Sequence, residues 1–312
     1  MKSFPRYAPV LLVLCLLSWV PLAHAAGYTF IEVPGVPGAA FTLPSGISST
    51  GQMVGYYVDS AGVEHGFLRS SGGAYTFFDV PGASYAVGIN PAGQISGTYT
   101  DGAGAEQGFL RSSGGDYTFF DGVSGASSTS AFGMNNTGQI VGCYRDSGGV
   151  EHGFLRSAAG IYTPIDVTGA SSTRAIGITD AGQISGTYYD SAWVRHGFLL
   201  SGGVYTSIDA PGASGTEAYG INTSGLIVGN YSDSETNHGF LLSGGVYTTI
   251  DAPDALLTLI FGINDAGQMV GVYMDGTGGH AFLATPAPLP PTVLLLGSAL
   301  LGLAGWRRIS KG

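Results

Sequence analysis

Charge, cysteine and catalytic motifs are all scarce in this sequence. Only 10% of the 312 residues are charged, the net charge is −10, and residues 27–284 contain no lysine. Nucleic acid is excluded as a partner, because binding phosphates requires a basic surface. The only cysteines are Cys15 and Cys143, and Cys15 lies in the N-terminal apolar run, so the mature chain cannot form an internal disulfide. No Gly-x-Ser-x-Gly, His-Glu-x-x-His, Walker or Cys-x-x-Cys motif occurs, which predicts a non-enzymatic protein without a cofactor.

Residues 1–25 have the pattern of a secretory signal peptide. Lys2 and Arg6 precede an apolar run at residues 8–20, and Ala23 and Ala25 provide a small-x-small cleavage site. A run of about 13 residues is too short for a transmembrane helix. We therefore expect export and cleavage by signal peptidase after Ala25.

The C-terminal end has a second targeting pattern. Residues 285–291 are a Pro-rich linker, and residues 292–312 contain an apolar run followed by a basic tail. The motif comprises Pro288, Leu289, Pro290, Arg307 and Arg308. It resembles the PEP-CTERM group of bacterial sorting signals, in the VPLPA-type variant. The resemblance implies transient anchoring in the inner membrane by the C-terminal helix, recognition by an exosortase-type protease, and display at the cell envelope, cell surface or outside the cell. A permanent C-terminal anchor is the alternative.

The region between these ends consists of six similar units. A His-Gly-Phe-Leu motif or a close variant recurs at spacings of 42 to 45 residues. Between its copies lie a Gly-Ile-Asn-type motif, as at Gly88, and a Tyr-Thr motif, as at Tyr75. Each unit contains four short segments rich in β-branched and aromatic residues, separated by Gly-containing turns. Four strands in about 43 residues is the size of a β-propeller blade.

The arrangement of the units predicts a closed ring over residues 26–284. The repeat region begins with an unpaired Tyr-Thr segment at Tyr28, and its last unit, which contains His280, lacks one. If the first segment completes the last unit, an all-β six-bladed propeller closes without an open edge. An open β-solenoid is the alternative. The repeats also resemble the HAF family of bacterial extracellular repeats, with the literal triplet at His280-Ala281-Phe282, which implies a secreted repeat protein.

Histidines and acids occupy equivalent positions in the units. His65, His152, His196, His238 and His280 correspond to one another, with Gln107 at this position in the remaining unit, and we interpret them as buried residues that tie a turn to a strand. Two acids per unit end predicted strands and should line one face of the ring: Asp59, Asp101, Asp146, Asp190, Asp233 and Asp275 after one strand, and Glu32, Asp79, Asp121, Asp166, Asp209 and Asp251 after another. Asp commonly stabilises turns through backbone N–H groups. Weak Ca²⁺ binding by the acidic face is the alternative, with no dedicated metal site.

Few residues depart from the repeat. They are Arg145, Arg174, Trp193, Arg195 and Glu217. Trp193 lies in a turn near Arg195 and Tyr189, and an aromatic side chain there could stack on a sugar. These three residues are the predicted ligand patch, and local packing is the other interpretation of Trp193.

Together these patterns predict an exported, non-enzymatic surface protein. Its expected ligand is a polysaccharide or another surface protein of the envelope or biofilm matrix. The alternative is a propeller hydrolase or lyase that acts on extracellular carbohydrate. The regularity of the units favours binding, because a catalytic centre needs unlike residues at one place.

Overall fold

The computed structural model describes residues 27–80, 84–120 and 122–287. The predicted signal peptide, Asp121 and the sorting motif from Pro288 to Arg308 lie outside the described residues. Thr29–Pro286 form one compact unit, and this part of the chain is all-β, as predicted. The part of the chain that the structure describes contains no helix long and apolar enough to cross a membrane.

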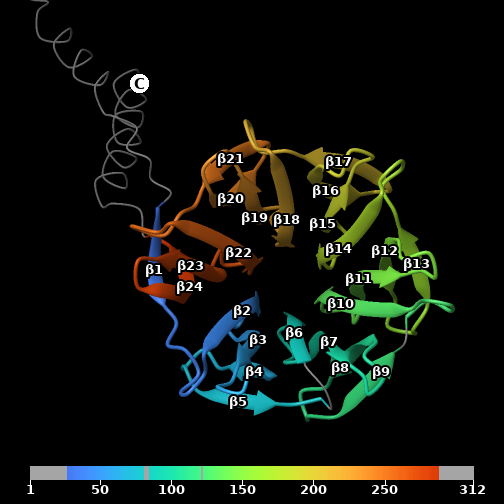
Figure 1. Ribbon diagram of the computed structural model, residues 1–312, viewed down its shortest axis with the longest axis horizontal. Coiled ribbons are helices and arrows are strands. Elements are labelled where there is room, and N and C mark those ends of the chain that lie inside the picture. Colours follow the sequence, from blue (N-terminus) through green and yellow to red (C-terminus); the bar gives the residue numbers. More distant parts are fainter. Residues whose placement is uncertain (1–26, 81–83, 121, 288–312) are drawn as a thin grey trace, which may run out of the picture. The chain divides into compact units, whose positions relative to one another are not determined.

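Six four-stranded antiparallel sheets form the blades of a ring, which confirms the six-bladed propeller (Figure 1). Blades 1 to 3 consist of β2 (Phe41–Ile47), β3 (Met53–Val58), β4 (Glu64–Arg69) and β5 (Tyr75–Phe78); β6 (Ser84–Ile89), β7 (Ile95–Thr100), β8 (Glu106–Arg111) and β9 (Tyr117–Phe120); β10 (Ser128–Met134), β11 (Ile140–Arg145), β12 (Glu151–Arg156) and β13 (Tyr162–Ile165). Blades 4 to 6 consist of β14 (Ser172–Ile178), β15 (Ile184–Tyr189), β16 (Arg195–Ser201) and β17 (Val204–Ile208); β18 (Gly215–Ile221), β19 (Ile227–Ser232), β20 (Asn237–Ser243) and β21 (Val246–Thr249); β22 (Leu257–Ile263), β23 (Met269–Asp275), β24 (Gly278–Pro286) and β1 (Tyr28–Glu32).

The N-terminal strand closes the ring. In the last sheet β1 lies beside β24, in the order β1-β24-β23-β22, so the first strand completes blade 6 (Figure 1). The ring of Phe30 packs 5.0 Å from that of Phe282, centroid to centroid, and the N–H of Val33 donates to the carbonyl of Ala281 at 2.8 Å. Pairing the two ends of the described ring in one sheet gives blade 6 the same number of strands as the other blades.

The first strand of each blade borders the central channel, and a glycine permits its close approach to the next blade. A Cβ atom on Gly133 would lie 2.4 Å from the carbonyl oxygen of Ile176, and one on Gly88 would lie 2.6 Å from that of Phe132. Only glycine avoids these clashes. The large buried side chain of each blade is a phenylalanine at one repeated position: Phe67, Phe109, Phe154, Phe198, Phe240 and Phe282.

Candidate functional site

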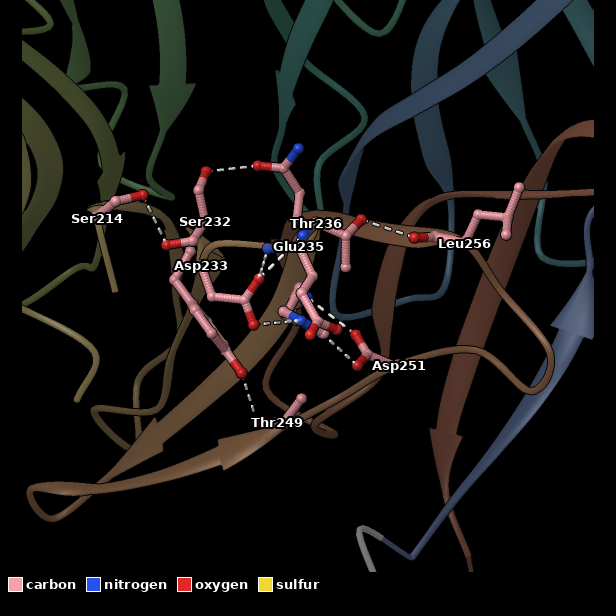
Figure 2. A network of polar contacts seen from close by, with 12 residues as sticks. Ser214, Ser232, Asp233, Glu235, Thr236, Thr249, Asp251 and Leu256 are labelled. Carbon is pink, nitrogen blue, oxygen red and sulfur yellow. Dashed lines mark hydrogen bonds and ion pairs between the residues drawn. The ribbon is translucent and has the colours of Figure 1, made fainter. Parts of the chain in front are cut away.

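In five blades a histidine connects two strand ends on one face of the ring. We call this face of the ring the acidic face. The turns that follow the second strand of each blade lie on it. In blade 5, His238 Nδ1 lies 2.7 Å from Asp251 Oδ2, and its Nε2 lies 3.2 Å from Asp233 Oδ2 (Figure 2). The N–H groups of Glu235 and Thr236 donate to Asp233 Oδ1. The equivalent clusters are Asp59–His65–Asp79, Asp146–His152–Asp166, Asp190–His196–Asp209 and Asp275–His280–Glu32.

These histidine–carboxylate clusters are structural ties, and one expectation about them is wrong. The histidine side chains are 21–29% exposed rather than buried, because they lie on the blade surface and stack on a tyrosine of the preceding strand, as His238 does on Tyr231. The hydrogen bond to Asp79 raises the pKa of His65. The backbone N–H of Val63 lowers the pKa of Asp59. The turn and the histidine thus share the oxygens of the aspartate that follows the second strand, as at Asp233.

The clusters do not form a multidentate metal site. Within residues 27–80, 84–120 and 122–287, no group of three or more His, Cys, Asp or Glu side chains is arranged to hold a metal ion. In blade 2, Gln107 replaces the histidine and Asp101 keeps the turn role, accepting from the N–H groups of Ala103 and Ala105. Weak Ca²⁺ binding by the acidic face stays a prediction.

The two ends of the channel differ in chemistry. At the end away from the acidic face, repeated small and polar residues close the ring. There the amide of Asn222 donates to the carbonyl of Asn264 at 3.0 Å, and that of Asn264 donates to the carbonyl of Ser48 at 3.0 Å. At the acidic-face end, the residue three places before the inner glycine differs in most blades: Leu43, Tyr85, Ser130, Arg174, Glu217 and Leu259. The repeat therefore loses its symmetry at one mouth of the channel.

A cleft opens at this mouth, which we call the mouth cleft. Its larger compartment, of about 380 Å³, is lined by polar and aromatic side chains that include Tyr56, Tyr85, Glu106, Arg145 and Arg174. Its smaller compartment, of about 200 Å³, is lined by residues that include Arg174, Tyr189, Glu217 and Tyr219. Ser45, Val87, Phe132 and Arg174 border both compartments. The volume and the mixture of aromatic and convergent polar groups are typical of a small-molecule site.

Side chains at the start of the third strands connect neighbouring blades across the mouth. Glu151 of β12 accepts from Arg174 of the next blade, at 2.7 Å from Nε and 2.9 Å from Nη2, and from Arg145 Nη2 at 2.7 Å. One blade further on, the charges are reversed: Arg195 Nη1 lies 3.0 Å from Glu217 Oε1. The four charged departures from the repeat therefore form two ion-pair groups at adjacent blade junctions.

Glu151, Tyr85 and Cys143 of the cleft have pKa values that are shifted further from neutrality. Burial raises the pKa of Glu151, but hydrogen bonds from Arg174 and Arg145 outweigh this and lower it overall. Burial raises the pKa of Tyr85, and the hydrogen bond to Glu64 adds to this effect. Burial also raises the pKa of Cys143, beneath the larger compartment, to about 12, which leaves no thiolate nucleophile at neutral pH.

The structure brings the three residues of the predicted ligand patch to one hairpin. The rings of Trp193 and Tyr189 are 5.7 Å apart, centroid to centroid, and the Trp193 side chain is 68% exposed. Tyr189 lines the smaller compartment, so the aromatic pair lies at the rim of the mouth cleft. Arg195 instead uses its guanidinium to pair with Glu217.

The mouth cleft itself was not predicted from the sequence. Arg145, Arg174 and Glu217 are departures from the repeat, but the sequence pattern does not group them as one site. The signal was available in part, since Arg174 and Glu217 occupy the same repeat position on inner strands. The spacing of the repeats does not predict the size of the mouth cleft. It also does not predict that Glu106 and Tyr56 line the same compartment as the arginines.

No family model and no curated protein matches the chain. Solved structures match most of its length. A gluconolactonase from Xanthomonas campestris is 12% identical, over 85% of this chain and 92% of that one, with a TM-score of 0.52. A mutant of AofleA from Arthrobotrys oligospora is 10% identical, over 84% and 94%, with a TM-score of 0.52. A mutant of Aleuria aurantia lectin in complex with Fucα1-6GlcNAc is 12% identical, over 82% and 99%, with a TM-score of 0.49. At such identities the two matches with a TM-score of 0.52 show the propeller fold alone.

Proposed function

We propose that this protein is an exported, non-enzymatic propeller that binds carbohydrate at the mouth cleft. The observation that carries the proposal is the convergence of tyrosines with charged hydrogen-bonding side chains at one end of an otherwise regular ring. Tyrosine offers an apolar ring and a polar hydroxyl, which suit the alternating surfaces of a sugar. Arginine can donate hydrogen bonds to the hydroxyl groups of a sugar, and glutamate can accept hydrogen bonds from them.

The pKa shifts favour binding over catalysis at this cleft. General acid–base catalysis near neutral pH requires groups whose pKa values lie close to that pH. Those of Glu151, Tyr85 and Cys143 all move away from it. The unlike charges at the mouth are, however, the asymmetry that a catalytic centre needs, so a propeller hydrolase or lyase acting on carbohydrate is the second candidate.

A glycan array of the purified chain tests the binding proposal. We expect selective binding that is lost when Trp193 at the cleft rim is replaced by glycine. The matched control is Ile161→Ala, which removes an equally exposed side chain (68%) at the opposite end of blade 3. A blank array for the folded protein would refute the proposal, and release of shortened or unsaturated sugar products would favour the enzymatic alternative.

The proposal also places the protein at the cell envelope or outside the cell. It is supported by the signal-peptide pattern at residues 1–25 and by the PEP-CTERM-like motif at Pro288–Pro290 with Arg307 and Arg308. Fractionation of cells that carry the full chain, or a chain ending at residue 284, tests it. We expect the full chain to pass through the inner membrane fraction and the shortened chain to bypass it. Retention of both in the cytoplasm would refute export.

A further inference from the structure

Two guanidinium groups share a single carboxylate in the larger compartment. Glu151 is only 15% exposed, whereas Arg145 and Arg174 are 51% and 44% exposed. The guanidinium groups engage both oxygens of Glu151, and Oε2 also accepts from the hydroxyl of Ser172 at 3.3 Å. One carboxylate neutralises one of the two arginines, so this group carries one excess positive charge.

Both arginines keep donors for a ligand. A guanidinium has five N–H donors. Among the described residues, Arg145 has a hydrogen-bond partner only at Nη2, and Arg174 only at Nε and Nη2. Both side chains line the larger compartment. Free guanidinium N–H groups are best matched by a carboxylate, which can accept two parallel hydrogen bonds.

The same compartment also contains an acceptor. Glu106 Oε2 accepts from the hydroxyl of Ser130 at 2.7 Å, and Oε1 has no hydrogen-bond partner in the described part of the chain. A carboxylate accepts hydrogen bonds and repels a second anion, so Glu106 requires a hydroxyl donor on the ligand. A simple inorganic anion would satisfy the arginines and be repelled by Glu106. A neutral sugar would satisfy Glu106 and leave the arginines without an anion.

We propose that the larger compartment binds a uronic acid residue of an acidic saccharide. Its carboxylate lies against Arg145 and Arg174, and its ring hydroxyls donate to Glu106. This inference rests on the proposed carbohydrate-binding function and names the ligand class.

Calorimetric titration of the full chain with uronic acid oligosaccharides and their methyl esters tests the inference. Galacturonate, glucuronate and mannuronate oligosaccharides are the probes, because each ester keeps every hydroxyl and loses the charge. We expect at least one free acid to bind ten-fold or more tightly than its ester, with an affinity that falls as salt is added. Equal affinity of every acid and its ester would overturn the inference and leave the proposed function standing.

Three variants connect the preference to the named side chains. Arg145→Gln should weaken binding of the acid more than binding of the ester, so that most of the ten-fold preference for the acid is lost. Glu106→Gln should weaken acid and ester alike. The control is Arg69→Leu, which removes a positive charge from the opposite end of its blade at a position where blade 4 already has Leu200. An unchanged preference in Arg145→Gln would overturn the inference. If no saccharide of any kind binds the wild-type chain, the proposed function fails as well.

Discussion

Trp193 has a backbone conformation that favours glycine, which makes its replacement unusually informative. Its φ angle is 62°, in the left-handed region. The equivalent turn positions in blades 1, 2 and 3 are Gly62, Gly104 and Gly149, with φ angles of 81°, 84° and 86°. A side chain in this conformation costs about 1–2 kcal/mol. The fold therefore tolerates a strained residue at the rim of the mouth cleft, where glycine would serve the turn better.

Trp193→Gly should leave the free energy of unfolding nearly unchanged. Relief of strain contributes about 1–2 kcal/mol. The greater freedom of glycine in the unfolded chain offsets about 0.4–1 kcal/mol of this. Loss of the ring contact with Tyr189 costs about 0.5–1.5 kcal/mol. These effects cancel to within about 1 kcal/mol. Trp193→Ala loses the same contact and keeps the strain, so it should be less stable than the glycine variant by about 1 kcal/mol.

Urea unfolding of the three proteins measures this order. In thermal unfolding, the same difference of 1 kcal/mol corresponds to roughly 2–4 °C in Tm for a domain of this size. On a glycan array both variants should lose binding, and since the glycine variant keeps its stability, that loss cannot be attributed to unfolding. An alanine variant as stable as the glycine variant would refute the strain argument. Full binding by Trp193→Gly would remove Trp193 from the site.

Three other expectations follow from the ring and its junctions. Gly88→Ala should destabilise the protein by about 3 kcal/mol or more in urea unfolding, because its Cβ would lie 2.6 Å from the Phe132 carbonyl, whereas Gly102→Ala, with no atom within 4 Å, should be neutral. Arg195→Glu should lower the Tm and the added Glu217→Arg should restore it, with a coupling of about 0.5–1 kcal/mol in a double-mutant cycle; no restoration would show that the pair is not coupled. The histidine–carboxylate clusters should give a Tm that is highest between about pH 4 and 6.5. The raised pKa values of His65, His238 and His280 make their contribution decline as pH rises above 6.5, and the lowered pKa values of Asp59, Asp146 and Asp275 make theirs decline as pH falls below 3.8; a Tm that rises from pH 6.5 to 8 would contradict this.

The repeated motifs in the sequence were enough to predict the six-bladed propeller. Six copies of a four-strand unit cannot bury their apolar faces singly, and the unpaired Tyr-Thr segment at Tyr28 matches the strand that the last unit lacks. The equivalence of the five histidines also follows from spacing alone. Their exposure does not, because spacing says nothing of which side of a blade meets solvent.

The mouth cleft was decided only by the tertiary structure. Arg145, Glu151 and Arg174 come from three strands of two blades, and their contacts depend on the distance at which adjacent blades pack. That distance is fixed by the inner glycines, whose missing side chains let one backbone approach the next. The sequence by itself determined the repeat, the closure of the ring and the residues that break its symmetry. The tertiary structure determined that these residues meet at one end of the channel, because closing the ring brings the inner strands of all six blades around a single axis.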